Sequence, residues 1–337
     1  MDEAKQAWLD GTPEKPIDAD EEIVDPHHHL WDMPTSTYLL PELHADTGAG
    51  HNVVQTVFVE CAAGYRTDGP EHMRPVGETE FVLDQALESA ESDGAEIAGI
   101  VGFADLARGA AVEEVLQAHV DAGGGRFRGI RHANAWDGSE QIRESHTKPP
   151  PGLLADRGFR EGFAKLGSTG LSFDAWMFHP QVPELADLAA AVPDTAVVLD
   201  HLGGPLGIGP YADDRAAVRA VLRPALEELA RRENVVVKVG GIGMSIYGSG
   251  FNKMERAPDS QTVAAAWSDD VRHCVETFGP DRCMFESNFP VDRQGCSYTV
   301  LFNAFQRISD EAGYTAGERA DLFAGTARRF YRLPTPG

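Results

Sequence analysis

The sequence predicts a single-domain α/β fold, a (β/α)8 TIM barrel of eight parallel strands. Eight short apolar segments alternate with segments of helical periodicity, a pattern typical of parallel βαβ units. Seven of the eight segments end in, or just before, a residue whose side chain could bind a metal or a substrate or transfer a proton. Active sites of TIM barrels lie at the carboxyl ends of the strands. An open doubly wound sheet is the alternative, but no glycine fingerprint for a nucleotide follows the first strand.

The predicted strands are short and rich in Val, Ile and Phe. They cover residues 23–27, 53–60, 97–103, 127–132, 171–178, 196–201, 235–239 and 283–288. Helical spacing of apolar residues predicts helices at 78–92, 111–122, 156–166, 182–191, 216–232, 264–278, 299–312 and 316–331. Segments 33–52, 61–77 and 134–152 contain Gly and Pro and are expected to be loops, the last one a surface or lid loop. Residues 1–21 are a predicted polar N-terminal arm, and residues 22–333 the barrel.

Charge and composition limit the possible partners. The formal net charge of −24 argues against binding to nucleic acid or anionic membranes, since both need basic patches. No apolar run approaches the roughly 20 residues that cross a bilayer, and the polar N-terminus has no hydrophobic leader. Four cysteines without regular spacing predict free thiols. We expect a soluble, cytoplasmic protein with a small-molecule partner, and a homo-oligomer stays open.

The first strand leads into three histidines within residues 23–32 (IVDPHHHLWD). Side chains alternate along a strand, so His27 and His29 point to one face and His28 to the other. Two neutral imidazoles at a strand end can bind one divalent ion, with zinc as the first choice. A histidine-rich turn or a tag remnant is the other interpretation, although tags lie at termini and carry more histidines.

Two later strands also deliver histidines. His179, in a His-Pro turn after the fifth strand, is predicted as a third metal ligand, although such a turn also caps a strand. His201 follows an apolar strand and precedes a Gly-Gly-Pro turn that leaves room for its ring. We interpret His201 as a general acid or base, or as a group that stabilises the transition state.

Charged and aromatic residues near other strand ends form a predicted substrate-binding set. Arg131 and His132 suit a carboxylate, because guanidinium binds carboxylate bidentately. An ion pair that closes the barrel is an equal alternative. Lys238 could anchor an anionic substrate or neutralise Glu60 inside the barrel, and Trp136 is expected to line the pocket. Together these residues predict a small acidic substrate.

Four segments resemble the amidohydrolase superfamily and, within it, the amidohydrolase-2 group. Residues 25–32 are similar to the group's first-strand H-x-H motif, and residues 199–205 (LDHLGGP) to its sixth-strand histidine. Residues 178–180 (FHP) resemble its fifth-strand histidine, and residues 286–290 (ESNFP) its eighth-strand segment. The forms of the first and last segments are most similar to the fuconolactonase-like branch. The resemblance implies a hydrolase that opens a lactone or related cyclic ester, usually with a divalent metal.

Asn288 departs from this pattern, because the resemblance implies a metal-binding and proton-handling aspartate at its position. An amide is an uncharged, weaker ligand and cannot act as a general base. Either histidines hold the ion with a carboxylate from elsewhere, or the site works without metal. Asp292, or Glu286 if the strand end kinks, could supply that carboxylate. We therefore assign Asn288 and Asp292 to the catalytic set with His201.

Two other functions stay open at this level. The group that the sequence resembles includes non-oxidative decarboxylases and a hydratase, but these normally use the strand-eight aspartate that Asn288 replaces. A barrel that binds a metabolite without turning it over is the third possibility. Asn288 keeps that possibility open, and four histidines near strand ends argue against it.

Overall fold

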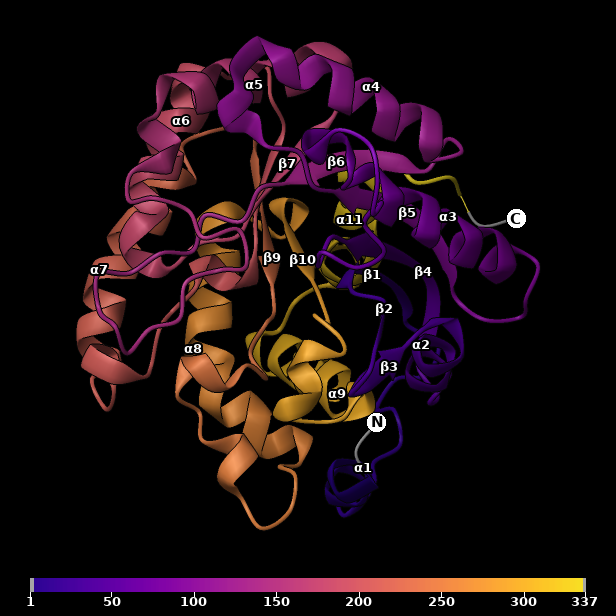
Figure 1. Cartoon of the computed structure of the whole chain (residues 1–337). Coiled ribbons are helices and arrows are strands. Elements are labelled where there is room, and N and C mark those ends of the chain that lie inside the picture. Colours follow the sequence, from indigo (N-terminus) through magenta and orange to yellow (C-terminus); the bar gives the residue numbers. More distant parts are fainter. Residues whose placement is uncertain (1–2, 336–337) are drawn as a thin grey trace.

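Eight parallel strands form one sheet in the computed structural model, which describes residues 3–335 (Figure 1). The strands are neighbours in chain order: β1 (Glu22–His28), β4 (Asn52–Val59), β5 (Glu96–Gly102), β6 (Phe127–Arg131), β7 (Ser172–Ala175), β8 (Val197–Leu199), β9 (Val235–Val239) and β10 (Cys283–Phe285). The segment after β10 meets β1, where Asn288 N donates to His27 O at 2.9 Å and His29 N donates to Phe289 O at 2.8 Å. These bonds bring the two edges together, and the predicted (β/α)8 barrel is confirmed.

Helices between the strands pack around the outside of the barrel (Figure 1). The longer ones are α3 (Val76–Ala90), α4 (Glu113–Ala122), α5 (Arg157–Thr169), α6 (Val182–Ala191), α7 (Arg215–Leu229), α8 (Ser260–Phe278) and α9 (Tyr298–Ala312). Each overlaps a helix that the apolar spacing predicts. Side-chain caps begin several of them: Asp156 accepts from Phe159 N in α5, and Asp259 accepts from Thr262 N in α8.

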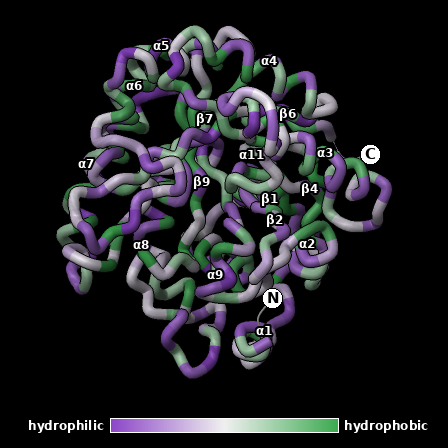
Figure 2. Tube along the Cα trace, in the orientation of Figure 1, coloured by the Kyte–Doolittle hydropathy of each residue, from purple (hydrophilic) through white to green (hydrophobic). Residues whose placement is uncertain are grey.

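Strand residues are buried on both faces, because side chains fill the barrel and helices cover it outside. Val57, Phe58 and Val59 of β4 have no exposed surface, although successive side chains point to opposite faces. Figure 2 shows apolar residues along the strands and hydrophilic ones on the outer loops and helix faces. A charged residue inside this core needs a partner, because burial removes its hydration.

The segment 33–52 is more ordered than the sequence predicts. Residues 31–38 form an antiparallel hairpin of β2 (Trp31–Met33) and β3 (Ser36–Tyr38), and α2 (Leu40–Thr47) follows. The loop prediction was wrong because it rested on the prolines. Pro41 lies in the first turn of α2, where a missing N–H costs no hydrogen bond. The Glu42 carboxylate accepts from Leu39 N at 2.9 Å and supports that turn.

The predicted helix 316–331 is interrupted. It consists of α10 (Ala316–Ala320), one π-helical turn (Asp321–Gly325) and α11 (Thr326–Phe330). The π turn packs against the amino-terminal side of the barrel, where Leu322 and Phe323 are buried. Apolar spacing predicts helix here but does not distinguish an α turn from a π turn.

The N-terminal segment begins with α1 (Glu3–Asp10) and then runs along the barrel. Trp8 Nε1 donates to Met254 O at 2.9 Å, and Thr12 Oγ1 donates to Ala257 O at 2.6 Å. Ile17 N donates to Asn303 Oδ1 at 3.0 Å, which ties the segment to α9. The boundary between arm and barrel at residue 22 stays a prediction. None of the helices within residues 3–335 combines the length and apolarity needed to cross a membrane.

Candidate active site

Two histidines and a glutamate meet at the carboxyl ends of three strands. His27 lies near the end of β1, His201 follows β8 and Glu286 follows β10. Glu286 lies between the rings, with Oε2 2.8 Å from His27 Nδ1 and Oε1 2.6 Å from His201 Nδ1. All three side chains are buried. We call these three residues the central cluster.

Glu286 fixes the orientation of His201. Its Oε1 lies within hydrogen-bond distance of the His201 ring and also accepts from His201 N at 3.1 Å. Tyr247 Oη donates to His201 O at 2.8 Å. The φ of His201 is +55°, a left-handed conformation that is uncommon outside glycine and occurs where surrounding contacts impose it. Within residues 3–335 no group hydrogen-bonds His201 Nε2, so this nitrogen remains for a ligand or substrate.

Two cations, from β6 and β9, face His27 of β1 across the barrel interior. Lys238 Nζ lies 3.3 Å from His27 Nδ1, and Arg131 Nη1 lies 3.3 Å from His27 Nε2. Lys238 also donates to Asp174 Oδ2 at 2.6 Å and lies 3.2 Å from Asp200 Oδ1. Positive charge is therefore held next to His27 by groups that are themselves paired.

Acidic groups outnumber basic ones in this interior. The carboxylates belong to Glu60, Asp174, Asp200 and Glu286, and the cations are Lys238 and Arg131. If all six were ionised, four negative and two positive charges would leave an excess of two negative charges. Both Asp200 oxygens and Glu286 Oε2 are buried without a hydrogen bond, although buried polar atoms nearly always have a partner. Bound protons or one divalent cation would balance this excess.

Burial keeps the imidazoles of the central cluster neutral. It lowers the pKa of His27 well below its usual value, with a further contribution from Lys238, and lowers the pKa of His201 to about 3. Burial raises the pKa of Glu286 to about 8 and that of Asp200 to about 6, against the opposing effect of Lys238. A neutral imidazole can bind a metal or accept a proton. A proton on Glu286 must leave before that carboxylate binds a metal.

The donor set of the central cluster fits a divalent ion. One possible ligand atom from each of its residues lies within 4.8 Å of the others. Two imidazoles and a carboxylate are the donors of many catalytic zinc sites, which keep a further position open for water or substrate. Glu286 Oε2 makes no hydrogen bond although His27 Nδ1 lies 2.8 Å away, and an ion bound by both atoms would satisfy that oxygen.

His29 lies beside the cluster rather than in it. Its ring centre is 5.0 Å from that of His27, whereas His28 points away and contacts Thr56 and Phe58, as strand alternation predicts. His29 Nδ1 donates to Val59 O at 2.7 Å, and its Nε2 lies 3.3 Å from Asn288 Oδ1. Both ring nitrogens of His29 therefore have protein neighbours.

Asn288 and Asp292 form a buried pair next to His29. Asn288 Nδ2 donates to Asp292 Oδ1 at 2.8 Å, and Gly243 N donates to Asp292 Oδ2 at 2.7 Å. Burial raises the pKa of Asp292 well above its usual value. The pair orients Asn288 towards His29, and neither residue belongs to the central cluster. Their predicted catalytic roles stay predictions.

The remaining predicted site residues lie around the mouth of the barrel. His179 is apart from the central cluster: its ring packs against Tyr211, and Leu206 N donates to its Nδ1. Its role as a third ligand stays a prediction. Trp136 is half-buried, and its backbone N donates to Gln181 Oε1.

Arg131 and Glu60 form the ion pair that was the alternative to substrate binding. Arg131 Nε donates to Glu60 Oε1 at 2.7 Å, and Nη2 donates to Glu60 O. His146, from the predicted lid loop, lies with Nε2 2.9 Å from Glu60 Oε2. Burial raises the pKa of Glu60, but Arg131 and His146 outweigh burial and bring it down to about 2. Lys238 pairs with Asp174 and Asp200 instead of Glu60.

Three residues of this site were missed in the sequence. Asp174 and Asp200 were passed over as parts of strands, although an acid inside an apolar strand is itself a signal of a paired, buried charge. His146 lies in a polar loop and carries no local signal. Glu286 was named only as a carboxylate that a kink could bring in, and it lies at the centre.

A parallel barrel with a buried group of histidines and a carboxylate at its carboxyl end defines a TIM barrel with an acid–base or metal site. The model of the family described as amidohydrolase (Amidohydro_2) matches residues 24–333, and the chain belongs to that family. The predicted resemblance is thereby confirmed.

Several proteins of known name or structure are similar to this chain. An L-fucono-1,5-lactonase of Burkholderia multivorans is 29% identical over 93% of this chain and 97% of its own length. A crystal structure of an amidohydrolase from Burkholderia multivorans with bound zinc has a TM-score of 0.72 and 26% identity, covering 93% of this chain and 99% of that one. A 5-carboxyvanillate decarboxylase of Sphingomonas paucimobilis has a TM-score of 0.54 at 12% identity, covering 94% and 100%. The last likeness concerns the fold alone.

Proposed function

We propose that this protein is a hydrolase that opens the lactone of a small, oxygen-rich compound at the central cluster. The observation that carries the proposal is His201, whose Nδ1 is held by Glu286 while Nε2 has no partner within residues 3–335. A carboxylate on one ring nitrogen fixes the imidazole and leaves the other as a proton acceptor. The 29% identical lactonase supports the same class of substrate.

In the proposed reaction the oxygen of water attacks the lactone carbonyl while His201 Nε2 accepts a proton from that water. The ring C–O bond then breaks, and the same nitrogen returns the proton to the leaving oxygen, which gives a hydroxy acid. Lys238 and Arg131 contribute positive charge beside His27 as the carbonyl oxygen becomes negative. The ion pair with Glu60 keeps Arg131 in place.

The proposed cofactor is zinc, held by His27, His201 and Glu286. When bound, it would polarise the carbonyl and lower the pKa of a water molecule. His201 would take one of two roles, because a neutral imidazole has a single nitrogen with a free lone pair. With zinc bound it would be a ligand through the nitrogen that faces Glu286, and without zinc it would be a base through Nε2. Metal content decides how far the site depends on the first role.

The experiment combines turnover with metal content. The purified protein, made without a His tag or added metal, is assayed for acid release from fucono-1,5-lactone, glucono-1,5-lactone and carboxylated lactones, and its metal is measured by plasma mass spectrometry. We expect hydrolysis of at least one lactone and about one zinc per chain. Zinc should be lost in His27→Ala and Glu286→Gln and kept in His179→Gln.

Several results would change the proposal. Hydrolysis that survives removal of all metal would place the chemistry on His201, Lys238 and Arg131 alone. Zinc loss in His179→Gln would restore the ligand set predicted from the sequence. Failure to hydrolyse any lactone, combined with tight binding of one of them, would favour a barrel that binds a metabolite without turnover. Loss of carbon dioxide from a carboxylated phenol would favour a decarboxylase.

A further inference from the structure

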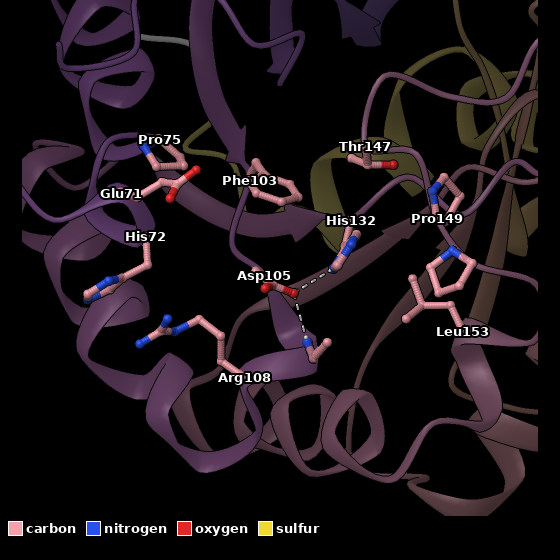
Figure 3. A pocket seen from close by; sticks show the side chains of 12 residues that line it. Glu71, His72, Pro75, Phe103, Asp105, Arg108, His132, Thr147, Pro149 and Leu153 are labelled. Carbon is pink, nitrogen blue, oxygen red and sulfur yellow. Dashed lines mark hydrogen bonds and ion pairs between the residues drawn. The ribbon is translucent and has the colours of Figure 1, made fainter.

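A pocket lies near the central cluster at the carboxyl end of the barrel. Its volume is about 590 Å³, and it is lined by residues that follow β5 and β6, including Phe103, Asp105 and His132 (Figure 3). None of the central cluster residues lines it. Ligand sites typically occupy roughly 300–1,000 Å³. The pocket is therefore large enough for a ring of small-molecule size.

His132 presents a hydrogen-bond donor to this pocket. Its side chain is 7% exposed, and Leu106 N donates to its Nδ1 at 3.3 Å. Burial lowers the pKa of His132 to about 4, although Asp105 opposes this, so the ring is neutral near neutral pH. A neutral imidazole carries one hydrogen, and because Nδ1 accepts, that hydrogen is on Nε2. Nothing within residues 3–335 hydrogen-bonds Nε2.

Other polar groups of the pocket can also form further hydrogen bonds or ion pairs. Arg108 is exposed and forms no ion pair with any residue from 3 to 335. Asp105 Oδ1 accepts from Ala107 N, which leaves its other oxygen free, and Glu71 makes no side-chain hydrogen bond within the same range. In Figure 3 the ring of Phe103 lies above Asp105, with His132 on one side of Asp105 and the Arg108 guanidinium on the other side, towards His72. Two donors and two carboxylate acceptors thus line the same pocket as an aromatic ring.

The charges and hydrogen-bonding groups of the pocket favour one class of ligand over others. A carboxylate would bind Arg108 but would be repelled by Asp105 and Glu71. An apolar ligand would desolvate four polar groups without replacing their hydrogen bonds. A hydroxylated ring satisfies both requirements, because each hydroxyl donates and accepts while the C–H face packs on an aromatic ring.

Two residues that line the pocket, His132 and Thr147, each follow a residue of the candidate active site in the chain. His132 follows Arg131, whose Nη1 lies 3.3 Å from His27 Nε2. Thr147, which lines the pocket, follows His146, which contacts Glu60. Arg131, Glu60 and His146 therefore form the boundary that a ligand reaching from the central cluster into the pocket would cross.

We propose that this pocket is a subsite for a hydroxylated, sugar-like group attached to the lactone, with His132 and Arg108 as donors and Asp105 and Glu71 as acceptors. The proposal rests on the proposed lactone hydrolysis and names the larger substrate class, a glycosylated aldonolactone. Opening of such a lactone releases a glycosyl aldonic acid, and binding of that acid can be measured without turnover.

The test compares binding of gluconate with binding of cellobionate, lactobionate and maltobionate, which carry one more sugar ring, by titration calorimetry. We expect at least one of the three to bind about tenfold more tightly than gluconate. This advantage should disappear in Arg108→Met and His132→Leu and persist in His132→Gln, whose amide retains a donor. Arg157→Met, at an exposed arginine of α5 outside the pocket, is the matched control.

Binding and hydrolysis separate the two proposals. If no bionate binds more tightly than gluconate, or if the advantage survives in Arg108→Met, the subsite is wrong even when gluconolactone is hydrolysed. If the advantage follows the variants as expected but no lactone is opened, the subsite stands and lactone hydrolysis is wrong. The His132→Leu result is used only if the unfolding temperature of this variant equals that of the wild type. Arg108 is exposed, so Arg108→Met tests the subsite even if His132→Leu does not fold.

Discussion

The buried contact between His201 and Glu286 sets the orientation of the His201 ring. The short distance of 2.6 Å between His201 Nδ1 and Glu286 Oε1 orients the ring, and burial keeps the ring neutral. His27 has no comparable freedom, because its two nitrogens lie 3.3 Å from Lys238 and Arg131. Among the cluster histidines, His201 is therefore the better candidate for proton transfer.

We expect His201→Gln to lower kcat for the hydrolysed lactone by about 10²–10⁴, because glutamine cannot accept the proton. Glu286→Gln should reduce kcat as well, since the amide no longer favours the same orientation of the ring. The measurement is steady-state kinetics, with circular dichroism and unfolding temperature to show that both variants fold. His273→Gln, on α8 outside the barrel, is the control. Full turnover in His201→Gln would remove the central role of His201.

At the scale of elements, the loop 134–152 joins the site to the surface. Ser145 N donates to Ala135 O at 2.9 Å, and Tyr211 Oη donates to Asp137 Oδ2 at 2.7 Å, so the loop is tied to itself and to its neighbour. His146 makes the contact with Glu60 in the barrel. Ser145 and Thr147 also donate to Ala133 O, so His146 is one of several side chains that hold the loop, and the lid role stays a prediction.

We expect His146→Ala to loosen the loop while leaving the barrel intact. Loss of a partly exposed ion pair costs about 1 kcal/mol, which corresponds to roughly fivefold faster amide exchange where local opening controls exchange. Hydrogen exchange followed by mass spectrometry should show the increase in peptides from 134–152 and no change in β4 or β9. Arg143→Ala, at an exposed position of the same loop, should leave exchange unchanged. Equal exchange in both variants would show that His146 does not hold the loop.

For the whole molecule, buried carboxyls set how stability depends on pH. Glu78 on α3 is buried, and its Oε1 accepts from Cys61 N and Ala63 N. Burial, aided by the charge of Glu60, raises the pKa of Glu78 to about 8. The folded state then binds a proton that the unfolded state releases near pH 4.5. The contribution of this proton to the free energy of unfolding is fully present below pH 4.5, and it is lost as the pH rises through about 8.

We expect Glu78→Gln to flatten this dependence, because glutamine keeps the acceptor oxygen and does not ionise. Urea unfolding at pH 5.5 and pH 8.5 measures the free energy of unfolding of each variant. Between these values the wild type should lose more stability than Glu78→Gln, by on the order of a few kcal/mol. Glu88→Gln, exposed on the same helix, should behave as the wild type. A wild type and Glu78→Gln with the same pH slope would contradict the raised pKa.

The sequence by itself determined the barrel and the facing of His27 and His29. Both follow from short-range periodicity: strands alternate with helices, and side chains alternate along β1. The lactone-hydrolase prediction depended on a resemblance carried by whole segments, and family membership agrees with it.

The tertiary structure alone decided which residues join at the centre. β10 ends at Phe285, and Asn288 takes a φ of +55°, so the chain turns and Glu286 enters the central cluster while Asn288 faces His29. His179, alike in sequence to the other histidines, packs against Tyr211 instead. Local patterns show which residues lie at strand ends. Where each backbone turns, and which charges it buries together, depends on contacts between residues far apart in the chain.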